Sequence, residues 1–153
     1  MSSATGTALS ATVTTVESGV DHVGLPELRF VRPLPGFGDL RRFVLVELPT
    51  DAGGDEPVLF ELRSMEDQAV RFLAAAPTAF FPDYEIELDE RACEELGLAD
   101  AADALVLVLL TIGRDADATT ANLLAPVVIN ARTRAAAQVI LSGSNWSVRA
   151  AVA

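Results

Sequence analysis

Hydrophobic residues along this chain occur in short runs, and turn-forming residues separate one run from the next. Leu105 to Ile112 is continuously apolar, which predicts a strand that is buried on both faces. Proline and glycine mark turns at Pro33–Gly38 and Asp51–Pro57. The apolar and β-branched composition of the remaining runs favours strands as well. These runs cover residues 11–16, 43–48, 58–62, 119–122, 126–130 and 138–141, with residues 131–137 as a polar hairpin connection.

A strict alternation of apolar and charged residues follows Pro82. Such a period of two is typical of a strand with one face buried and the other in water. The apolar members are Tyr84, Ile86 and Leu88. The other side, called the acidic face below, consists of Asp83, Glu85, Glu87 and Asp89.

A short helix is expected directly after this alternation. Asp89 is a good N-cap residue, and Gly97 can adopt the left-handed conformation that ends a helix. Leu88 can then pack against Cys93, which predicts that the thiol faces the core and is inert.

Residues 64–75 allow two interpretations. Ser64 followed by Asp67 resembles a helix-capping pair, and the apolar residues after it would share one helical face. The stretch from Val70 to Leu73 fits a short strand before Pro77 equally well. Periodicity leaves both alternatives open.

About eight strands and one helix predict a mainly all-β chain, either an antiparallel sandwich or a barrel. The 153 residues correspond to one ordinary domain. Residues 1–10 are small and polar, and we expect them to form a disordered N-terminal tail.

Composition excludes several classes of function. The chain has 22 acidic and 11 basic residues, for a net charge of −11, and every basic residue is an arginine. Without lysine there is no P-loop lysine and no Schiff-base chemistry. The negative charge argues against direct binding of nucleic acid, because phosphates repel carboxylates. No cofactor fingerprint and no metal-ligand spacing occur, so we expect no cofactor.

The cysteine content and the hydropathy of the chain indicate in which cellular compartment it resides. The N-terminus shows no signal-peptide pattern, and a single cysteine cannot form an internal disulfide. The longest apolar run, Ala104–Ile112, is far shorter than the ~20 residues of a membrane-spanning helix. We therefore expect a cytoplasmic protein without membrane contact.

Candidate catalytic groups are few. His22 is the only histidine, and a lone histidine is usually structural or simply exposed. Asp115 and Asp117 have the alternate spacing of a calcium loop but lack its central glycine and final glutamate. Carboxylates on the same face of a strand lie ~7 Å apart, a separation that the catalytic pair of a glycosidase can have. A sugar-binding cleft is normally lined by aromatic side chains, however, and this chain has only one tryptophan and one tyrosine. A solvated edge is the favoured interpretation of the acidic face, with a binding edge as the other alternative.

Five blocks of this sequence, in order, resemble the FliW family of flagellar assembly factors. The two most distinctive are FFPDYEIEL and NLLAPVVIN. The blocks are Pro33–Leu48, Ser64–Asp67, Phe80–Leu88, Glu94–Asp100 and Asn122–Asn130. The resemblance implies a small antiparallel β-barrel-like domain with one or two short helices, placed here at residues 11–148. It also favours a turn at residues 64–67 and a strand at residues 70–75.

The resemblance further implies a regulator that is not an enzyme. Members of the family bind flagellin in the cytoplasm, and they bind CsrA, an RNA-binding translational repressor, which relieves repression of flagellin synthesis. A small-ligand-binding β-barrel is the alternative function.

Candidate partner-binding residues come from the two most distinctive blocks. Carboxylates that alternate with buried side chains form a rigid face, which loses little entropy on binding. Asparagine amides can capture the backbone of a partner strand, although both asparagines could equally cap turns beside Leu123–Pro126. The candidates are Asp83, Tyr84, Glu85, Glu87, Asn122 and Asn130.

Overall fold

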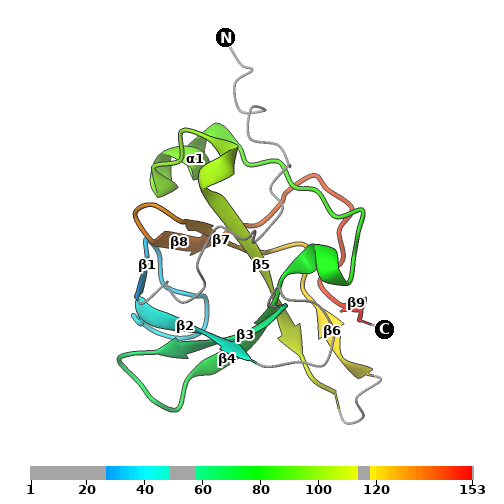
Figure 1. Ribbon diagram of the computed structural model, residues 1–153, viewed down its shortest axis with the longest axis horizontal. Coiled ribbons are helices and arrows are strands. Elements are labelled where there is room, and N and C mark those ends of the chain that lie inside the picture. The colour runs from blue at the N-terminus through cyan, green and yellow to red at the C-terminus, as the bar shows by residue number, and fades with distance from the viewer. Residues whose placement is uncertain (1–26, 49–57, 114–117, 153) are drawn as a thin grey trace.

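The computed structural model describes residues 27–48, 58–113 and 118–152, and this part of the chain contains nine strands and one α-helix (Figure 1). Two single-turn 3₁₀ helices are also present, at Pro77–Ala79 and Ala101–Asp103. The α-helix is α1 Glu90–Leu96. The strands are β1 Leu28–Phe30, β2 Arg42–Leu48, β3 Leu59–Ser64, β4 Arg71–Ala75, β5 Ala104–Thr111, β6 Thr120–Ala121, β7 Val127–Asn130, β8 Ala135–Gln138 and β9 Ala150–Ala151.

Seven of these strands close into a barrel. Their order is β4-β3-β2-β1-β8-β7-β5, and pairing of β4 with β5 completes the ring. Every neighbouring pair in the ring is antiparallel except β1 and β8, which run parallel. The predicted mainly-β barrel is therefore confirmed, with the difference that it is a mixed barrel rather than a purely antiparallel one. Closure removes the open edges that a flat sheet would expose.

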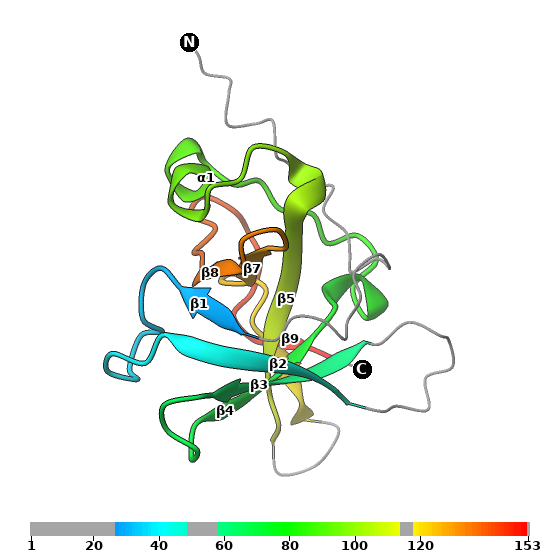
Figure 2. The ribbon, with the colours of Figure 1, turned by 60° about the vertical axis from the view of Figure 1, so that its left-hand side comes forward.

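Strand β5 is the long element around which the barrel closes, and Figure 2 shows it running the height of the molecule. On one edge it pairs first with β7, through residues 104–107, and then with β6, through residues 110–111. Its other edge pairs with β4, through residues 108–110. The chain moves from β6 to β7 by the bend at residues 122–126, and β9 pairs with the outer edge of β6.

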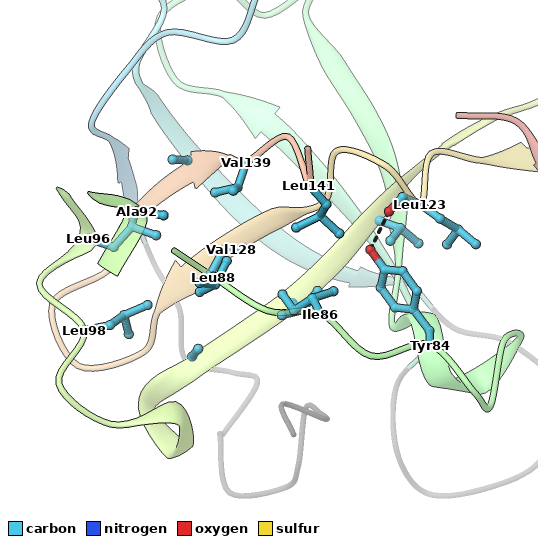
Figure 3. Close-up of a cluster of buried hydrophobic side chains, with 14 of the residues drawn as sticks. Tyr84, Ile86, Leu88, Ala92, Leu96, Leu98, Leu123, Val128, Val139 and Leu141 are labelled. Atoms are coloured by element: carbon cyan, nitrogen blue, oxygen red, sulfur yellow. Dashed lines mark hydrogen bonds between the residues drawn. The ribbon is translucent and has the colours of Figure 1, made fainter. Parts of the chain in front are cut away.

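Two hydrophobic cores lie on the two faces of the barrel wall. The inner core draws on all seven strands of the ring, so it fills the barrel interior. It consists of Leu28, Phe30, Leu34, Phe43, Phe60, Leu62, Ala74, Leu105, Leu107, Val127, Ile129 and Ala136. The outer core joins the opposite face of β5, β7 and β8 to residues outside the barrel. It includes Tyr84, Ile86, Leu88, Ala92, Leu96, Leu98, Ala104, Val106, Val108, Leu123, Val128, Ala137, Val139 and Leu141 (Figure 3).

The two cores explain the continuous apolar sequence of β5. Leu105 and Leu107 face the inner core, whereas Val106 and Val108 face the outer core. Successive side chains on a strand point to opposite faces, so burial of both faces requires apolar residues at every position. The prediction of a doubly buried strand is confirmed for residues 104–108, and exposure returns by Ile112, which is 61% exposed.

Residues 80–103, called the covering segment below, form the outer layer over this face of the barrel (Figure 3). Tyr84, Ile86 and Leu88 are buried and the residues between them are exposed, as the alternation predicted. The prediction of a strand there is wrong, because residues 83–89 lie outside every strand of the barrel sheet. Burial alone maintains the alternation, since apolar side chains on one side of an extended chain can dock on a neighbouring layer without backbone pairing.

The helix of the covering segment follows the predicted pattern at both ends. The Asp89 carboxylate accepts a hydrogen bond from the backbone N–H of Ala92 (2.8 Å). Gly97 ends the helix in the left-handed conformation (φ 67°), which costs glycine no Cβ clash. Cys93 is half-buried and packs against the outer core, and burial raises the pKa of its thiol, with Asp89 and nearby glutamates adding to the rise. The packing of Cys93 confirms the expected core-facing cysteine, and its inertness stays a prediction that the raised pKa supports.

The turn between β1 and β2 is also confirmed. Gly36 and Gly38 both adopt left-handed φ values, 88° and 64°, on either side of Phe37. The Phe37 ring packs edge-on against Phe72 of β4, with centroids 5.0 Å apart. The turn thereby brings an aromatic side chain of one hairpin onto the neighbouring hairpin.

The ambiguous stretch resolves into a turn and a strand. The Ser64 hydroxyl accepts hydrogen bonds from the N–H groups of Glu66 and Asp67, both at 3.0 Å, and β4 follows. A serine hydroxyl can accept hydrogen bonds from the N–H groups two and three residues later both in a turn and at the start of a helix. The sequence was therefore compatible with either structure.

Besides residues 83–89, three strand assignments differ from the sequence-based expectation. The predicted connection at residues 131–137 already contains most of β8, and the strand expected at 138–141 therefore begins and ends three residues earlier. Small alanines made β8 look like a loop, but Ala136 and Ala137 are fully buried, the first in the inner core and the second in the outer core. Strands β1 and β9 were not predicted, because each is only two or three residues long. The predicted tail, the strand at residues 11–16 and the loop at residues 51–57 lie outside the described residues.

Replacing Leu107 by alanine should destabilise the fold strongly. Its side chain is 2% exposed within the inner core, so truncation loses transfer free energy and leaves a cavity, at a cost of about 2–5 kcal/mol. Ile112→Ala is the matched control on the same run, and its exposed side chain should change stability by less than about 0.5 kcal/mol. Chemical denaturation measures both values. Equal costs for the two variants would contradict the placement of Leu107 in the core.

Candidate partner-binding surface

The acidic face projects into solvent from the covering segment. Asp83, Glu85 and Glu87 are exposed, and among the described residues none of their carboxylates has a hydrogen bond or an ion pair. The side chains between them, Tyr84 and Ile86, are 6% and 4% exposed. The buried side chains of Tyr84 and Ile86 therefore fix the position of the backbone that carries these carboxylates.

Tyr84 anchors the beginning of this arrangement. Its hydroxyl donates a hydrogen bond to the backbone carbonyl of Leu123 (2.7 Å), as Figure 3 shows. Its ring meets that of Trp146 edge-on, with centroids 4.7 Å apart. Burial raises the pKa of the Tyr84 phenol far above its usual value, so the group remains a neutral donor at physiological pH. Tyr84 is thus buried beneath the acidic face and holds its backbone in position.

Asn130 anchors the end of the covering segment. Its amide nitrogen donates to the carbonyls of Leu96 (2.8 Å) and Gly97 (3.3 Å), which are left unpaired at the end of α1. Its amide oxygen accepts from the N–H groups of Arg132 (2.9 Å) and Thr133 (3.2 Å). At 2% exposed, Asn130 is a buried clamp that joins the helix, β7 and the turn before β8.

Asn122 has a smaller role of the same kind. Its side-chain oxygen accepts hydrogen bonds from the backbone of Leu124 (3.1 Å) and Ala125 (3.0 Å). These contacts cap the bend between β6 and β7. The turn-capping alternative beside Leu123–Pro126 is therefore confirmed for Asn122, whereas Asn130 caps the turn before β8 and uses both atoms of its amide.

Charge is concentrated on the covering segment. Residues 83–103 contain nine carboxylates and one arginine, for a net charge of −8 out of −11 for the whole chain. Within the described part of the chain, two of these carboxylates have ion pairs, Glu95 with Arg32 (3.4 Å) and Asp103 with Arg132 (3.5 Å). Sequence reasoning missed the part of this surface beyond the acidic face, although the composition of the segment could have revealed it. That part consists of Glu90, Glu94, Glu95 and Asp100, all exposed.

The candidate residues consequently fall into two groups. Asp83, Glu85 and Glu87 share one exposed surface, and Tyr84 lies beneath it. Asn130, at the end of β7, holds the end of α1, whereas Asn122 caps the bend between β6 and β7 and has no hydrogen bond to the covering segment within the described residues. All four carboxylates of the acidic face are exposed to solvent, which does not favour a catalytic pair in a sugar cleft.

Other kinds of site find little support in the described residues. The barrel interior is occupied by large side chains, and Phe30, Phe43 and Phe60 are at most 3% exposed there, which counts against the small-ligand alternative. No three histidine, cysteine or acidic side chains in the described part of the chain are grouped so that they could hold a metal ion. None of its helices has the length and hydrophobicity needed to cross a membrane.

Comparison with known proteins gives one consistent family. Residues 9–152 match the family described as "FliW protein". The flagellar assembly factor FliW of Geobacillus kaustophilus is 40% identical over 122 residues, which cover 80% of this chain and 81% of that protein. The corresponding protein of Moorella thermoacetica is 37% identical over 80% of this chain and 75% of its own length.

A solved structure agrees with the sequence comparisons. The crystal structure of the flagellar assembly factor FliW superposes with a TM-score of 0.76 and 33% identity, covering 93% of this chain and 94% of that one. The shared barrel, the identity and the coverage of nearly the whole chain all point the same way. The chain belongs to the FliW family of flagellar assembly factors, which are not enzymes.

Proposed function

We propose that this chain regulates flagellum assembly by switching between two protein partners in the cytoplasm. One partner is flagellin, which it binds before export. The other is a CsrA-type RNA-binding translational repressor, and binding that repressor relieves repression of flagellin synthesis. Membership of a family of flagellar assembly factors supports the flagellar role.

The charge of the covering segment is the observation that carries the proposal. An RNA-binding regulator must present basic groups to hold phosphates. The covering segment presents eight exposed carboxylates, and those of the acidic face have no internal counter-ion among the described residues. Complementary potentials steer association and discriminate against partners of the wrong charge.

The anchoring of the covering segment also favours binding. Tyr84 and Asn130 hold its two ends on the barrel, and the outer core holds the residues between them. A surface that is already ordered pays little conformational entropy when a partner docks. The carboxylates are therefore presented at fixed spacing to an incoming basic protein.

Association with the CsrA-type regulator should slow as salt rises. Charges that attract each other across solvent are screened beyond ~8 Å at physiological ionic strength. Stopped-flow measurement of the association rate between about 50 and 500 mM salt tests this expectation. An association rate that does not change with salt would remove the electrostatic support for the proposal.

Neutralising the acidic face should weaken binding and leave the fold intact. The double variant Glu85→Gln and Glu87→Gln should lower affinity for the regulator by roughly 2- to 30-fold, since exposed ion pairs contribute about 0.2–1 kcal/mol each. Asp39→Asn, on the exposed turn between β1 and β2, is the control and should have no effect. Titration calorimetry measures affinity for the regulator and for flagellin, and the melting temperature checks the fold. Unchanged affinity for both partners would show that the acidic face is only solvated.

Asn130→Ala should act on stability rather than on partner affinity. It removes four hydrogen bonds, two to the carbonyls of Leu96 and Gly97 and two from the N–H groups of Arg132 and Thr133, which should cost about 2–4 kcal/mol. Asn130→Asp keeps the accepting oxygen but places a second carboxylate oxygen against the carbonyls of Leu96 and Gly97 in a buried site, so a cost at least as large as that of Asn130→Ala is expected. Denaturation curves give both values, and partner affinity is measured at a temperature where each variant is folded. A loss of affinity without a loss of stability would instead place Asn130 in the binding site.

A further inference from the structure

The backbone of the covering segment is extended and unpaired at the acidic face. Among the described residues, no backbone N–H or C=O group of Glu85, Ile86 or Glu87 makes a hydrogen bond. The N–H of Tyr84 bonds to Phe81 (2.9 Å), and regular pairing resumes in α1. The alternating burial of Tyr84, Ile86 and Leu88 is that of an extended chain, and no strand of the described residues pairs with it.

Such a stretch is a template for another strand. Backbone donors and acceptors of successive residues point to opposite edges of an extended chain, so alternate residues offer hydrogen bonds along one edge. Proteins usually pair or cover these groups, and an uncovered row recruits extended segments of other chains. The buried Ile86 and Leu88 side chains hold the template in register on the barrel.

We infer that this backbone receives an extended segment of the basic partner by strand addition, with basic side chains of that segment opposite Glu85 and Glu87. The inference rests on the proposed function, and it names how the same surface would bind. Opposite charges that face each other across two strands stabilise the pairing, and like charges destabilise it. A second copy of this chain would place carboxylates against carboxylates, so charge excludes the same stretch of another copy as the occupant.

Residue-resolved amide exchange tests this directly, with the CsrA-type regulator of the same organism as the probe. In the free chain, the amides of Glu85, Ile86, Glu87 and Leu88 should exchange rapidly, because they lack acceptors. With saturating regulator, two alternate amides should slow by at least about tenfold, either those of residues 85 and 87 or those of residues 86 and 88.

The pattern of protection distinguishes strand addition from other modes of docking. Uniform slowing of all four amides would indicate simple coverage and would overturn the inference. Amides already protected in the free chain would show that the backbone pairs within the chain itself, which would also overturn it. Binding without any change in exchange would overturn strand addition while the proposed function stands, whereas no binding at all would overturn both.

The variant Glu85→Gln with Glu87→Gln serves as the matched control. It removes both charges and keeps every backbone N–H group. At a regulator concentration high enough to saturate this variant, the alternate protection should persist, since the hydrogen bonds come from the backbone. Loss of the alternate pattern in the saturated variant would show that the carboxylates alone make the contact and would overturn the inference. The fluorescence of Trp146, the single tryptophan, checks that the covering segment stays docked, because its ring contacts Tyr84.

Discussion

Burial of the outer face of β5, β7 and β8 is the constraint on which the rest of this structure depends. The barrel interior is filled from its own strands, but the apolar residues on the outside of these three strands need a second layer. The covering segment supplies that layer with Tyr84, Ile86 and Leu88 and with the inner side of α1. Each fully buried side chain of this size contributes about 1.5–3 kcal/mol relative to exposure.

The same constraint determines what the opposite side of the covering segment can do. Once alternate residues are buried, those between them face solvent at the fixed spacing of an extended chain. Carboxylates at these positions become an ordered acidic surface, and the backbone between them has no strand partner in the described part of the chain. A layer that stabilises the barrel therefore also presents charge and hydrogen-bonding groups to another protein.

Buried polar contacts hold this layer at its two ends. Tyr84 reaches the carbonyl of Leu123, and Asn130 reaches the last carbonyls of α1. The first contact connects the layer to the bend before β7, and the second connects it to the last residue of β7, the strand beside β5 in the ring. Leaving a buried polar group without its hydrogen bond costs more free energy of folding than forming the bond gains. Alternative positions of the layer would break these bonds, so the two residues specify one position for it.

The sequence by itself determined the local features: the doubly buried β5, the alternation after Pro82, the caps at Asp89 and Gly97, and the mainly-β class. Each of these depends on side chains close together in the chain, where periodicity and capping chemistry act directly. Only the tertiary structure decided that residues 83–89 form a covering layer rather than a strand, and that Asn130 clamps α1. Both outcomes depend on partners more than thirty residues away. An alternation of apolar and polar residues indicates which side of an extended chain is buried, but it does not indicate whether the backbone is hydrogen-bonded to a neighbouring strand.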